Sequence, residues 1–219
     1  MSGLVFALPK GRLLKPTVKI IKKLSFLDIN KKIDKVSRKL KFTDSKTGNK
    51  FLLAKPKDIP AYVEHGAADL GITGKDVIME QNRKLYELLD LGFGECRLVL
   101  AVPGDVEINA AEKIPEHSRI ATSYPEITSQ YFRQLGKQVE IIYLNGSVEL
   151  APQVGLADFI VDITSTGTTL RKNNLVPVAE IMYSSARLVV NKVSYKTRYE
   201  KIKDIRERGI ENEDLKLSG

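Results

Sequence analysis

The chain has 219 residues, of which 42% are hydrophobic and 28% are charged, and its formal net charge is +8. This length and hydrophobic fraction suit one large domain or two smaller lobes, and they argue against intrinsic disorder. No apolar run approaches the roughly 20 residues of a membrane-spanning helix, and the single cysteine, Cys96, excludes a disulfide framework and a thiolate metal cage. The first cation, Lys10, follows the N-terminal apolar run instead of preceding it, so we expect no secretory signal and a cytoplasmic protein.

The positive charge is concentrated near the N-terminus. Residues 1–57 carry 16 Lys or Arg against three acids, whereas the remainder carries 19 against 24. A basic segment of this kind can bind nucleic acid, an acidic partner or a polyphosphate, or it can be the solvated face of a Lys-rich helix. No aromatic residues interleave with these lysines as a stacking surface requires, so we favour the solvated face and expect no nucleic-acid partner.

Short apolar runs alternate with helical patterns along the chain, which is typical of an α/β fold. Strands are predicted at Val5–Leu8, Leu40–Phe42, Phe51–Leu53, Asp69–Ile72, Leu98–Val102, Arg119–Ala121 and Val139–Leu144, with a hairpin joining the second and third. Helices are predicted after Gly11, over Asp58–Glu64 with Asp58 as N-cap, over Pro125–Leu135 with Gly136 closing it, and over Tyr195–Arg208.

Two segments of the chain repeat one pattern. Gly66–Gly74 and Gly155–Ile163 both end a helix at Gly, run through x-Ala-Asp into an apolar strand and lead to a turn. The similarity could arise by chance between two helix-to-strand connections. It could equally reflect two lobes of related topology.

Two related lobes would place the active site between them, since ligands of α/β proteins bind at the carboxyl ends of strands. No Ser/Gly-rich linker separates the halves, so we predict ordered crossings near Glu95–Pro103 and Ile181–Val193. Lobe I, the nucleotide side, would then be discontinuous and comprise residues 1–97 and 187–219. Lobe II would comprise residues 98–186.

The strongest candidate for a ligand site is a loop rich in hydroxyl groups. An apolar strand ends in Asp162, and the loop then reads Thr164, Ser165, Thr166, Gly167, Thr168 and Thr169 before a helix begins. Hydroxyl and backbone N–H donors at a helix N-terminus suit a phosphate monoester, and Gly167 lets the backbone approach the phosphate oxygens. Asp162 could reach ribose hydroxyls or a magnesium-bound water. The alternative is a capped helix start in a Thr-rich turn.

A second candidate is the turn from the first strand into the first helix, formed by Lys10, Gly11 and Arg12. Two cations beside a helix N-terminus suit a triphosphate or a pyrophosphate, although an exposed strand-end turn would have the same sequence. Asp69 and Gly71, in the repeated segment, could complete the opposing wall, or they could simply form a tight strand entry.

Four blocks of this sequence resemble, in the same order, those of ATP phosphoribosyltransferase in its short form. They are Leu8–Leu13, Asp58–Pro60 with Asp69–Ile72, Asn145–Pro152 and Asp162–Leu170, and the similarity covers nearly the whole chain. The family catalyses the first step of histidine biosynthesis, transferring the 5-phosphoribosyl group of phosphoribosyl pyrophosphate (PRPP) to N1 of ATP and releasing pyrophosphate. The resemblance implies an α/β fold of two lobes like the type II periplasmic-binding-protein architecture, with the active site in the interlobe cleft.

The resemblance also implies residue roles. PRPP would be bound by Asp162, Thr164, Ser165, Thr166, Gly167, Thr168 and Thr169, and ATP by Lys10, Gly11, Arg12, Asp69 and Gly71. Asp162, Glu149 and Arg12 would carry the catalysis. Other phosphoribosyltransferases often have two adjacent acids before this loop, whereas here Ile163 follows Asp162. The second acid could therefore be Asp158 or Glu149, and Glu149 could instead only stabilise the start of a helix after Ser147.

The expected cofactor is Mg²⁺, which would neutralise the leaving pyrophosphate with few direct protein ligands. No metal ligand is firmly assigned, although Asp162 and Glu149 could act through water. The long form of the family adds a C-terminal histidine-binding domain, which we expect to be missing here. The resemblance therefore implies a separate regulatory subunit similar to histidyl-tRNA synthetase, and a homodimer within a hetero-oligomer.

The alternative function is a non-catalytic bilobal module that binds a phosphorylated metabolite. Such a module needs a single anion site. The sequence offers two, at Lys10–Arg12 and Ser165–Thr169, so we favour the enzyme.

Overall fold

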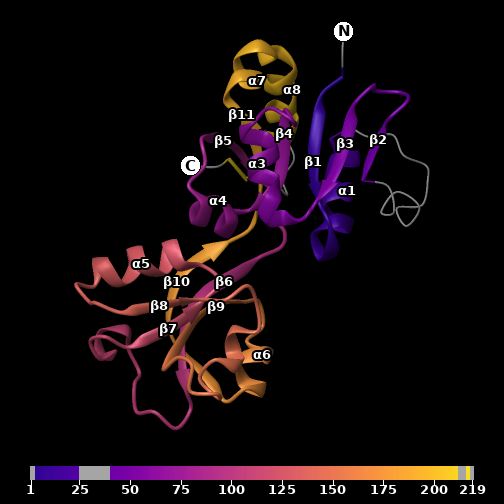
Figure 1. The fold of residues 1–219 in the computed structure, drawn as a ribbon. Helices are drawn as coiled ribbons and strands as arrows, with labels where there is room; N and C mark the ends of the chain where they lie inside the picture. Colours follow the sequence, from indigo (N-terminus) through magenta and orange to yellow (C-terminus); the bar gives the residue numbers. More distant parts are fainter. Residues whose placement is uncertain (1–2, 25–39, 212–215, 218–219) are drawn as a thin grey trace. The chain divides into compact units, whose positions relative to one another are not determined.

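The computed structural model describes residues 3–24, 40–211 and 216–217 of the chain. They form two compact α/β units, drawn in Figure 1. The first contains the described residues up to Gly94 and those from Ser185 onward, and the second spans Glu95–Ser184. These limits differ by two or three residues from the lobes expected from the sequence. Of the basic N-terminal segment, residues 25–39 lie outside the described residues.

The sheet of unit 1 has the order β12-β5-β11-β4-β1-β3-β2 among the described residues. Its strands are β1 (Val5–Pro9), β2 (Lys41–Thr43), β3 (Lys50–Ala54), β4 (Leu70–Gly74), β5 (Leu85–Asp90), β11 (Ala186–Asn191) and β12 (Lys216–Leu217). The helices are α1 (Leu14–Lys23), α3 (Ile59–Glu64), α4 (Lys75–Gln81), α7 (Lys192–Thr197) and α8 (Tyr199–Ile210), with 3₁₀ turns η1 (Gly11–Leu13) and η2 (Pro56–Asp58). β1 runs parallel to both of its neighbours, β3 and β4, and lies between them in Figure 1.

Burial on both faces explains why β1 is an almost continuous apolar run. Phe6 and Leu8 point into a core that contains apolar residues of α1 and α8, whereas Ala7 packs with residues of α3 on the other face. The predicted hairpin is confirmed, because β2 pairs antiparallel with β3 and Phe42 stacks on Phe51 with ring centroids 5.0 Å apart. The sheet therefore holds the turn after β1 at one edge of a well-packed core.

The sheet of unit 2 has the order β10-β6-β9-β7-β8. Its strands are β6 (Cys96–Pro103), β7 (Arg119–Thr122), β8 (Glu140–Tyr143), β9 (Phe159–Thr164) and β10 (Leu175–Ser184). The helices are α5 (Pro125–Gln134) and α6 (Thr168–Lys172), with 3₁₀ turns η3 (Ala111–Lys113) and η4 (Val148–Leu150). α5 packs on one face of the sheet, and η4 and α6 contribute to the core on the other.

Several element boundaries differ from those expected. The apolar run 181–193 is divided between β10 and β11 at Ser185, and the helix expected over Tyr195–Arg208 is two helices that meet at Arg198. Strand β5 was not predicted. Asp58 does occupy the N-cap position of α3, but its side chain makes no capping hydrogen bond there. Sequence patterns thus located the elements better than their ends.

The repeated pattern corresponds to the same local structure in both units. The N–H of Asp69 donates to Val5 O at 2.8 Å, and the N–H of Val5 donates to Asp69 Oδ2 at 2.8 Å. Asp158 makes the same pair of bonds with Arg119, at 2.9 and 2.8 Å. In each unit the strand that follows the aspartate runs parallel to the strand with which the aspartate forms these bonds. The two units therefore share a topology, and chance similarity does not explain the pattern.

Asp69 should be a strong contributor to stability because three groups of unit 1 depend on its buried carboxylate. Besides Val5, it accepts from Ser194 Oγ at 2.7 Å and lies 3.4 Å from Arg198 Nη1. We expect Asp69→Ala to lower the free energy of unfolding by about 2–4 kcal/mol, since it leaves these donors unpaired. Urea denaturation of the variant would measure this loss.

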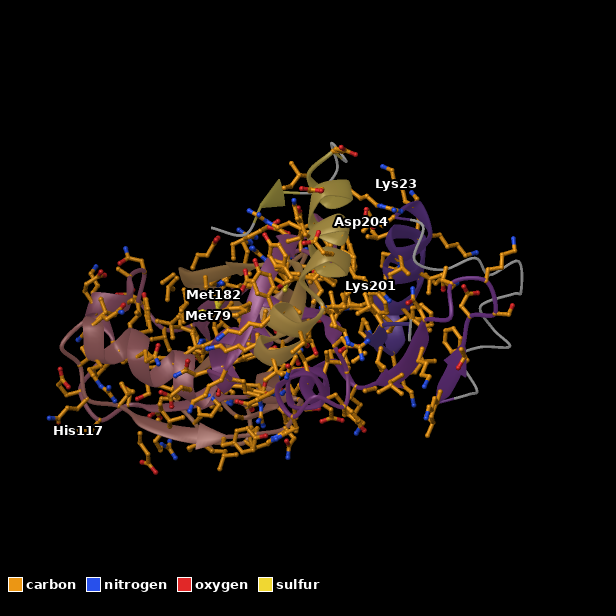
Figure 2. The ribbon with its side chains drawn as sticks, turned by 90° about the horizontal axis from the view of Figure 1, so that it is seen from above. Lys23, Met79, His117, Met182, Lys201 and Asp204 are labelled. Carbon is orange, nitrogen blue, oxygen red and sulfur yellow. The ribbon has the colours of Figure 1, made fainter. Side chains whose placement is uncertain are left out.

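The matched control is Asp204→Ala on α8, at the position labelled in Figure 2. Its carboxylate pairs with Arg208 at 2.9 Å but is half exposed. An exposed pair of this kind should change stability by no more than about 0.5–1 kcal/mol. Equal losses for the two aspartates would contradict the structural role of Asp69.

Candidate active site

The hydroxyl loop of unit 2 connects β9 to α6. Thr164 is buried, and its Oγ1 accepts a hydrogen bond from the N–H of Gly167 at 2.9 Å. Ser165, Thr166, Thr168 and Thr169 are exposed. The buried threonine thus fixes the loop from within, while the remaining hydroxyl groups face solvent and can meet a ligand.

A glycine and an arginine complete this loop. Gly167 has φ +71°, so the backbone conformation favours glycine, and its Cα lies close to the end of the Arg171 side chain. Arg171 Nη2 donates to Thr168 Oγ1 at 3.3 Å, and the hydroxyl oxygens of Thr168 and Thr166 lie 2.9 Å apart. Sequence reasoning missed Arg171. Its signal would have been a cation one helical turn after the loop glycine.

The candidate acids near this loop are held differently. Asp162 lies within β9, is half-buried, and accepts the N–H of Ile163 on Oδ1 at 2.8 Å. Glu149 lies in η4 and is also half-buried. Ser147 does stand at the N-cap of η4, but with φ +50° and without a side-chain capping bond. Asp158 belongs elsewhere, because it precedes β9 at the amino end of the strand. Asp158 therefore lies at the end of β9 away from the loop, and the role of Glu149 as the second acid stays a prediction.

Asp158 forms an ion pair with Arg119, and this pair shifts the pKa of both residues. Arg119 Nη2 donates to Asp158 Oδ1 at 2.8 Å, and the Arg119 N–H donates to Oδ2. These bonds, the side-chain bond first, hold the pKa of Asp158 below its ordinary value of 3.8. The same carboxylate, through the hydrogen bond and the charge, raises the pKa of Arg119.

In unit 1 the predicted cationic turn lies at the carboxyl end of β1. The N–H of Lys10 donates to Ala54 O at 2.8 Å, which ties the turn to the end of β3. Gly11 has φ +77° and open space around its Cβ position, so the backbone conformation is what favours glycine. Arg12 follows in η1 with an exposed side chain.

Two further lysines stand at this edge and were missed by sequence reasoning. Pro9 pairs with Ala54 in the parallel register of β1 and β3, so Lys55 leaves β3 beside Lys10, and Lys57 follows in η2. Both are exposed. The signal was their position directly after an apolar strand, which becomes informative only when that strand is known to lie beside β1.

Asp69 and Gly71 lie at the entry to β4, which is the alternative to a ligand wall that the sequence left open. Asp69 precedes β4 and lies at its amino end, whereas Lys10 lies at the carboxyl end of the parallel neighbour β1. Its carboxylate is engaged by Val5, Ser194 and Arg198 as described above. A Cβ on Gly71 would lie 2.6 Å from Ile59 Cγ2, so this glycine lets α3 pack closely on β4. Both residues therefore serve the packing of unit 1.

Metal ligands are sparse in the described part of the chain. No group of three or more His, Cys, Asp or Glu side chains there could hold a metal ion. An ion held mainly by a substrate's phosphates needs no such group. No helix in residues 3–24 or 40–211 is long and apolar enough to cross a membrane.

Comparison with known proteins gives consistent matches. Residues 55–210 match a family model described as HisG: ATP phosphoribosyltransferase. The chain is 59% identical over 205 residues to the ATP phosphoribosyltransferase of Halothermothrix orenii, covering 94% of this chain and 92% of that protein. Among solved structures it is similar to the ATP phosphoribosyl transferase (HisG:HisZ) complex from Thermotoga maritima, with 35% identity, a TM-score of 0.78, and 95% of this chain and 100% of that chain covered.

A more distant likeness concerns the fold alone. The substrate-binding protein of an amino acid ABC transporter superposes with a TM-score of 0.58 at 16% identity, over 94% of this chain and 91% of that chain. The expected α/β class with two lobes of the periplasmic-binding-protein type is thereby confirmed.

The Asp158–Arg119 pair should make stability depend on pH in acid. The folded state holds the pKa of Asp158 below its ordinary value, so the stability from its charge is present above about pH 4 and is lost as the pH falls further. Asp158→Asn keeps an oxygen for the Arg119 N–H but removes the charge. The difference in unfolding free energy between wild type and this variant should be constant from about pH 6 to 8 and shrink below about pH 4. A difference that persists undiminished in acid would contradict the ion pair.

Proposed function

The chain belongs to the ATP phosphoribosyltransferase family, and on that premise we propose that it transfers the 5-phosphoribosyl group of PRPP to N1 of ATP with release of pyrophosphate. This is the first step of histidine biosynthesis, and the enzyme is a pentosyltransferase. The structural observation that supports the proposal most is the loop between β9 and α6, whose exposed hydroxyl groups stand beside Arg171.

The reaction asks mainly for positioning and for electrostatic stabilisation. The lone pair of adenine N1 forms a bond to the anomeric carbon, while the bond from that carbon to pyrophosphate breaks and its electrons leave with pyrophosphate. The ribose carries positive character in between, like an oxocarbenium ion. Attack needs no base, because N1 already carries its lone pair. The protein's task is to align the two substrates and stabilise the departing charge.

We assign the 5′-phosphate of PRPP to the loop of unit 2. Ser165, Thr166, Thr168 and Thr169 would donate hydroxyl or backbone hydrogen bonds, and Gly167 would let the backbone approach. Arg171 would add one positive charge to a phosphate that carries up to two negative ones. Asp162 would bind the ribose hydroxyls, as a half-buried carboxylate in the adjoining strand could.

The polyphosphate of ATP is assigned to the cationic edge of unit 1. Lys10 and Arg12 would contact it, and Gly11 would shape the turn between them. Lys55 and Lys57 leave the neighbouring strand at the same edge, which gives the several positive charges that a triphosphate requires. Asp69 and Gly71 are omitted from this assignment because of their packing roles.

Magnesium, when bound to the pyrophosphate of PRPP, would neutralise the leaving group. Asp162 and Glu149 would hold it through water, which fits two half-buried carboxylates on adjoining elements better than a full protein cage.

The partner is proposed by analogy with the Thermotoga maritima protein, whose solved structure is a HisG:HisZ complex. We expect this chain to work with a regulatory subunit of the HisZ kind, similar to histidyl-tRNA synthetase, and to form a homodimer within the hetero-oligomer. A cytoplasmic location stays a prediction.

The direct test mixes the purified chain with ATP, PRPP and Mg²⁺, and follows pyrophosphate release together with near-ultraviolet absorbance. Substitution at adenine N1 changes the chromophore, so both signals should rise together. Pyrophosphate without the absorbance change would indicate another acceptor or hydrolysis. If neither signal appears with or without a HisZ-type subunit, the chain is a binding module and the proposed function is wrong.

Thr168→Val tests the phosphate assignment. It removes a hydroxyl group that also contacts Thr166 and Arg171, so we expect the KM for PRPP to rise about threefold to tenfold with little change in the KM for ATP. Steady-state kinetics with each substrate varied in turn would measure both values. Thr197→Val on α7, in the other unit, is the matched control and should leave both unchanged. Equal increases for the two substrates would count against the assignment.

Arg12→Ala tests the nucleotide assignment. A charge-assisted contact to the triphosphate is lost, so the KM for ATP should rise about tenfold to a hundredfold. The KM for PRPP should change much less. Arg206→Ala removes an exposed arginine on α8 and serves as the control. An unchanged response to ATP in Arg12→Ala would refute this role.

A further inference from the structure

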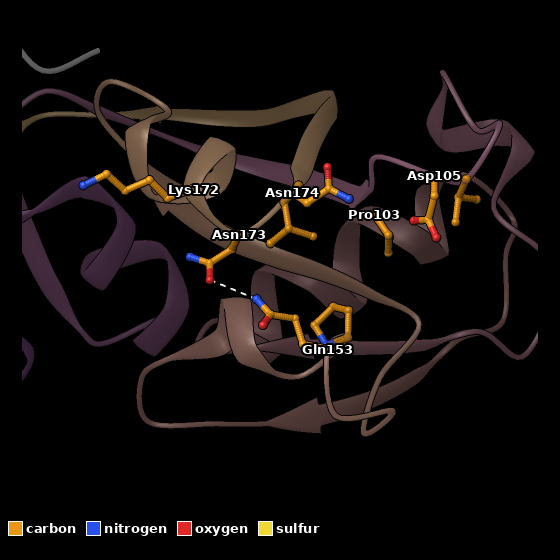
Figure 3. A pocket seen from close by; sticks show the side chains of 9 residues that line it. Pro103, Asp105, Gln153, Lys172, Asn173 and Asn174 are labelled. Atoms are coloured by element: carbon orange, nitrogen blue, oxygen red, sulfur yellow. Dashed lines mark hydrogen bonds between the residues drawn. The ribbon is translucent and has the colours of Figure 1, made fainter.

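Two amide side chains join α6 to the turn that follows η4. Gln153 Nε2 donates to Asn173 Oδ1 at 2.9 Å, as the dashed line in Figure 3 marks. Both side chains line a cavity of about 470 Å³ in unit 2, whose remaining wall includes Pro103 at the end of β6 and Leu175 at the start of β10. The hydrogen bond between the two side chains therefore connects α6 to the turn after η4 at the wall of this cavity.

Each amide is also connected to a segment assigned to PRPP. Asn173 Nδ2 donates to the backbone oxygen of Thr169, in the hydroxyl loop, at 3.0 Å. Gln153 Nε2 also lies 3.5 Å from the backbone oxygen of Glu149. A chain of hydrogen bonds thus runs from the backbone of Thr169, through the two amides, to the backbone oxygen of Glu149, the candidate second acid.

This link lies on the outer side of the contact between α6 and η4. On the inner side Leu170 packs with Val148 and Ala151 in an apolar core. Apolar packing fixes the spacing of two elements but is not directional, whereas hydrogen bonds are. The amide pair can therefore set the rotation of α6, and with it the direction of the loop at its start.

The end of α6 is anchored independently of this pair. The N–H of Gly104 donates to Asn174 O at 2.8 Å, and Asn174 has φ +53°. Leu175 pairs with Pro103 at the end of β6, so this anchor lies at the edge of the sheet opposite to the hydroxyl loop. The amides consequently stand away from the assigned phosphate position and can act on it only through the backbone.

Unit 1 also joins the helix before its central strand to the turn after it, through side-chain hydrogen bonds at neighbouring but not equivalent positions. Glu64 ends α3, which precedes β4 as η4 and its turn precede β9. Its carboxylate accepts from Arg83 Nη1 at 2.7 Å and from the N–H of Lys84 at 3.0 Å, in the turn after α4. Asn82 begins that turn with φ +44°, close to the value of Asn174. In both units, side-chain hydrogen bonds therefore join the segment before the central strand to the segment after it.

We propose that Gln153 and Asn173 are positioning residues for PRPP. Their hydrogen bond holds the backbone of Thr169 and that of Glu149 in one fixed relation, so that the loop and the acid meet the same substrate. This inference rests on the proposed function. It adds two residues that do not touch the substrate and that the sequence did not single out.

The test compares Gln153→Ala, Asn173→Ala and the double variant with the wild type, each assayed with a HisZ-type subunit and without one. We expect each single change to raise the KM for PRPP about threefold to tenfold, with the KM for ATP and the Tm unchanged. The double variant should be no worse than the worse single variant, because both changes break one link.

Two further variants sharpen this test. Gln153→Met keeps the length of the side chain but has no N–H donor, so it should raise the KM for PRPP as much as Gln153→Ala does. Gln130→Ala removes an exposed glutamine of the same unit that donates to Glu126 at 3.2 Å on α5, and it should change nothing.

The possible results distinguish a failure of the proposed enzyme function from a failure of the positioning role of Gln153 and Asn173. If the wild type fails to turn over in either condition, the proposed function is overturned, and this inference with it. If the wild type turns over but the alanine variants keep its KM for PRPP, or raise both KM values alike, the link alone is overturned. A lower Tm with unchanged kinetics would also overturn it, since it would assign the amides a merely structural role.

Discussion

Each sheet depends on a carboxylate at the beginning of a strand. Asp69 and Asp158 each exchange a backbone hydrogen bond with the neighbouring strand and accept its first N–H on the side chain. This pairing fixes a parallel register, and a register error of one residue would turn every core side chain to the wrong face. Once the strands are parallel, the turns at their carboxyl ends gather at one edge. The position of every proposed ligand contact follows from that constraint.

The two units share a topology but carry different residues at the carboxyl ends of their parallel strands. In unit 1 the edge carries Lys10, Arg12, Lys55 and Lys57, which suits a polyphosphate with several negative charges. In unit 2 the edge carries hydroxyl groups with Arg171 beside them, which suits a single phosphate group. Because loops lie outside the core, their composition can change without a cost in packing. The proposed reaction needs one site of each kind, and we propose that each unit provides one of them.

Much of the fold and of the candidate site could be predicted from the sequence, because the apolar runs and turn residues that mark them are local. The strand β1, the hairpin and the loop 164–169 were read from apolar runs and turn residues. The role of Asp69 stayed open because x-Ala-Asp marks the start of a strand, while the end that binds ligands depends on pairing partners far away in the chain. Lys55 was missed for the same reason. The boundary between β10 and β11 at Ser185 contains no Gly or Pro, so the sequence pattern gave no sign that one strand ends there and another begins.

The comparison of the two units also explains why the link in unit 2 is neutral. In unit 1 the bond from Glu64 to Arg83 is an ion pair, and the arginine lowers the pKa of that carboxyl group. An ion pair at Gln153 and Asn173 would place two ionised groups beside the elements that carry Glu149 and the hydroxyl loop. There it would compete with the charges that PRPP and its metal must meet. Amides give the same directional connection without altering the local field. The position of the link thus follows from the topology, and its chemistry follows from the ligand that the neighbouring loop is proposed to bind.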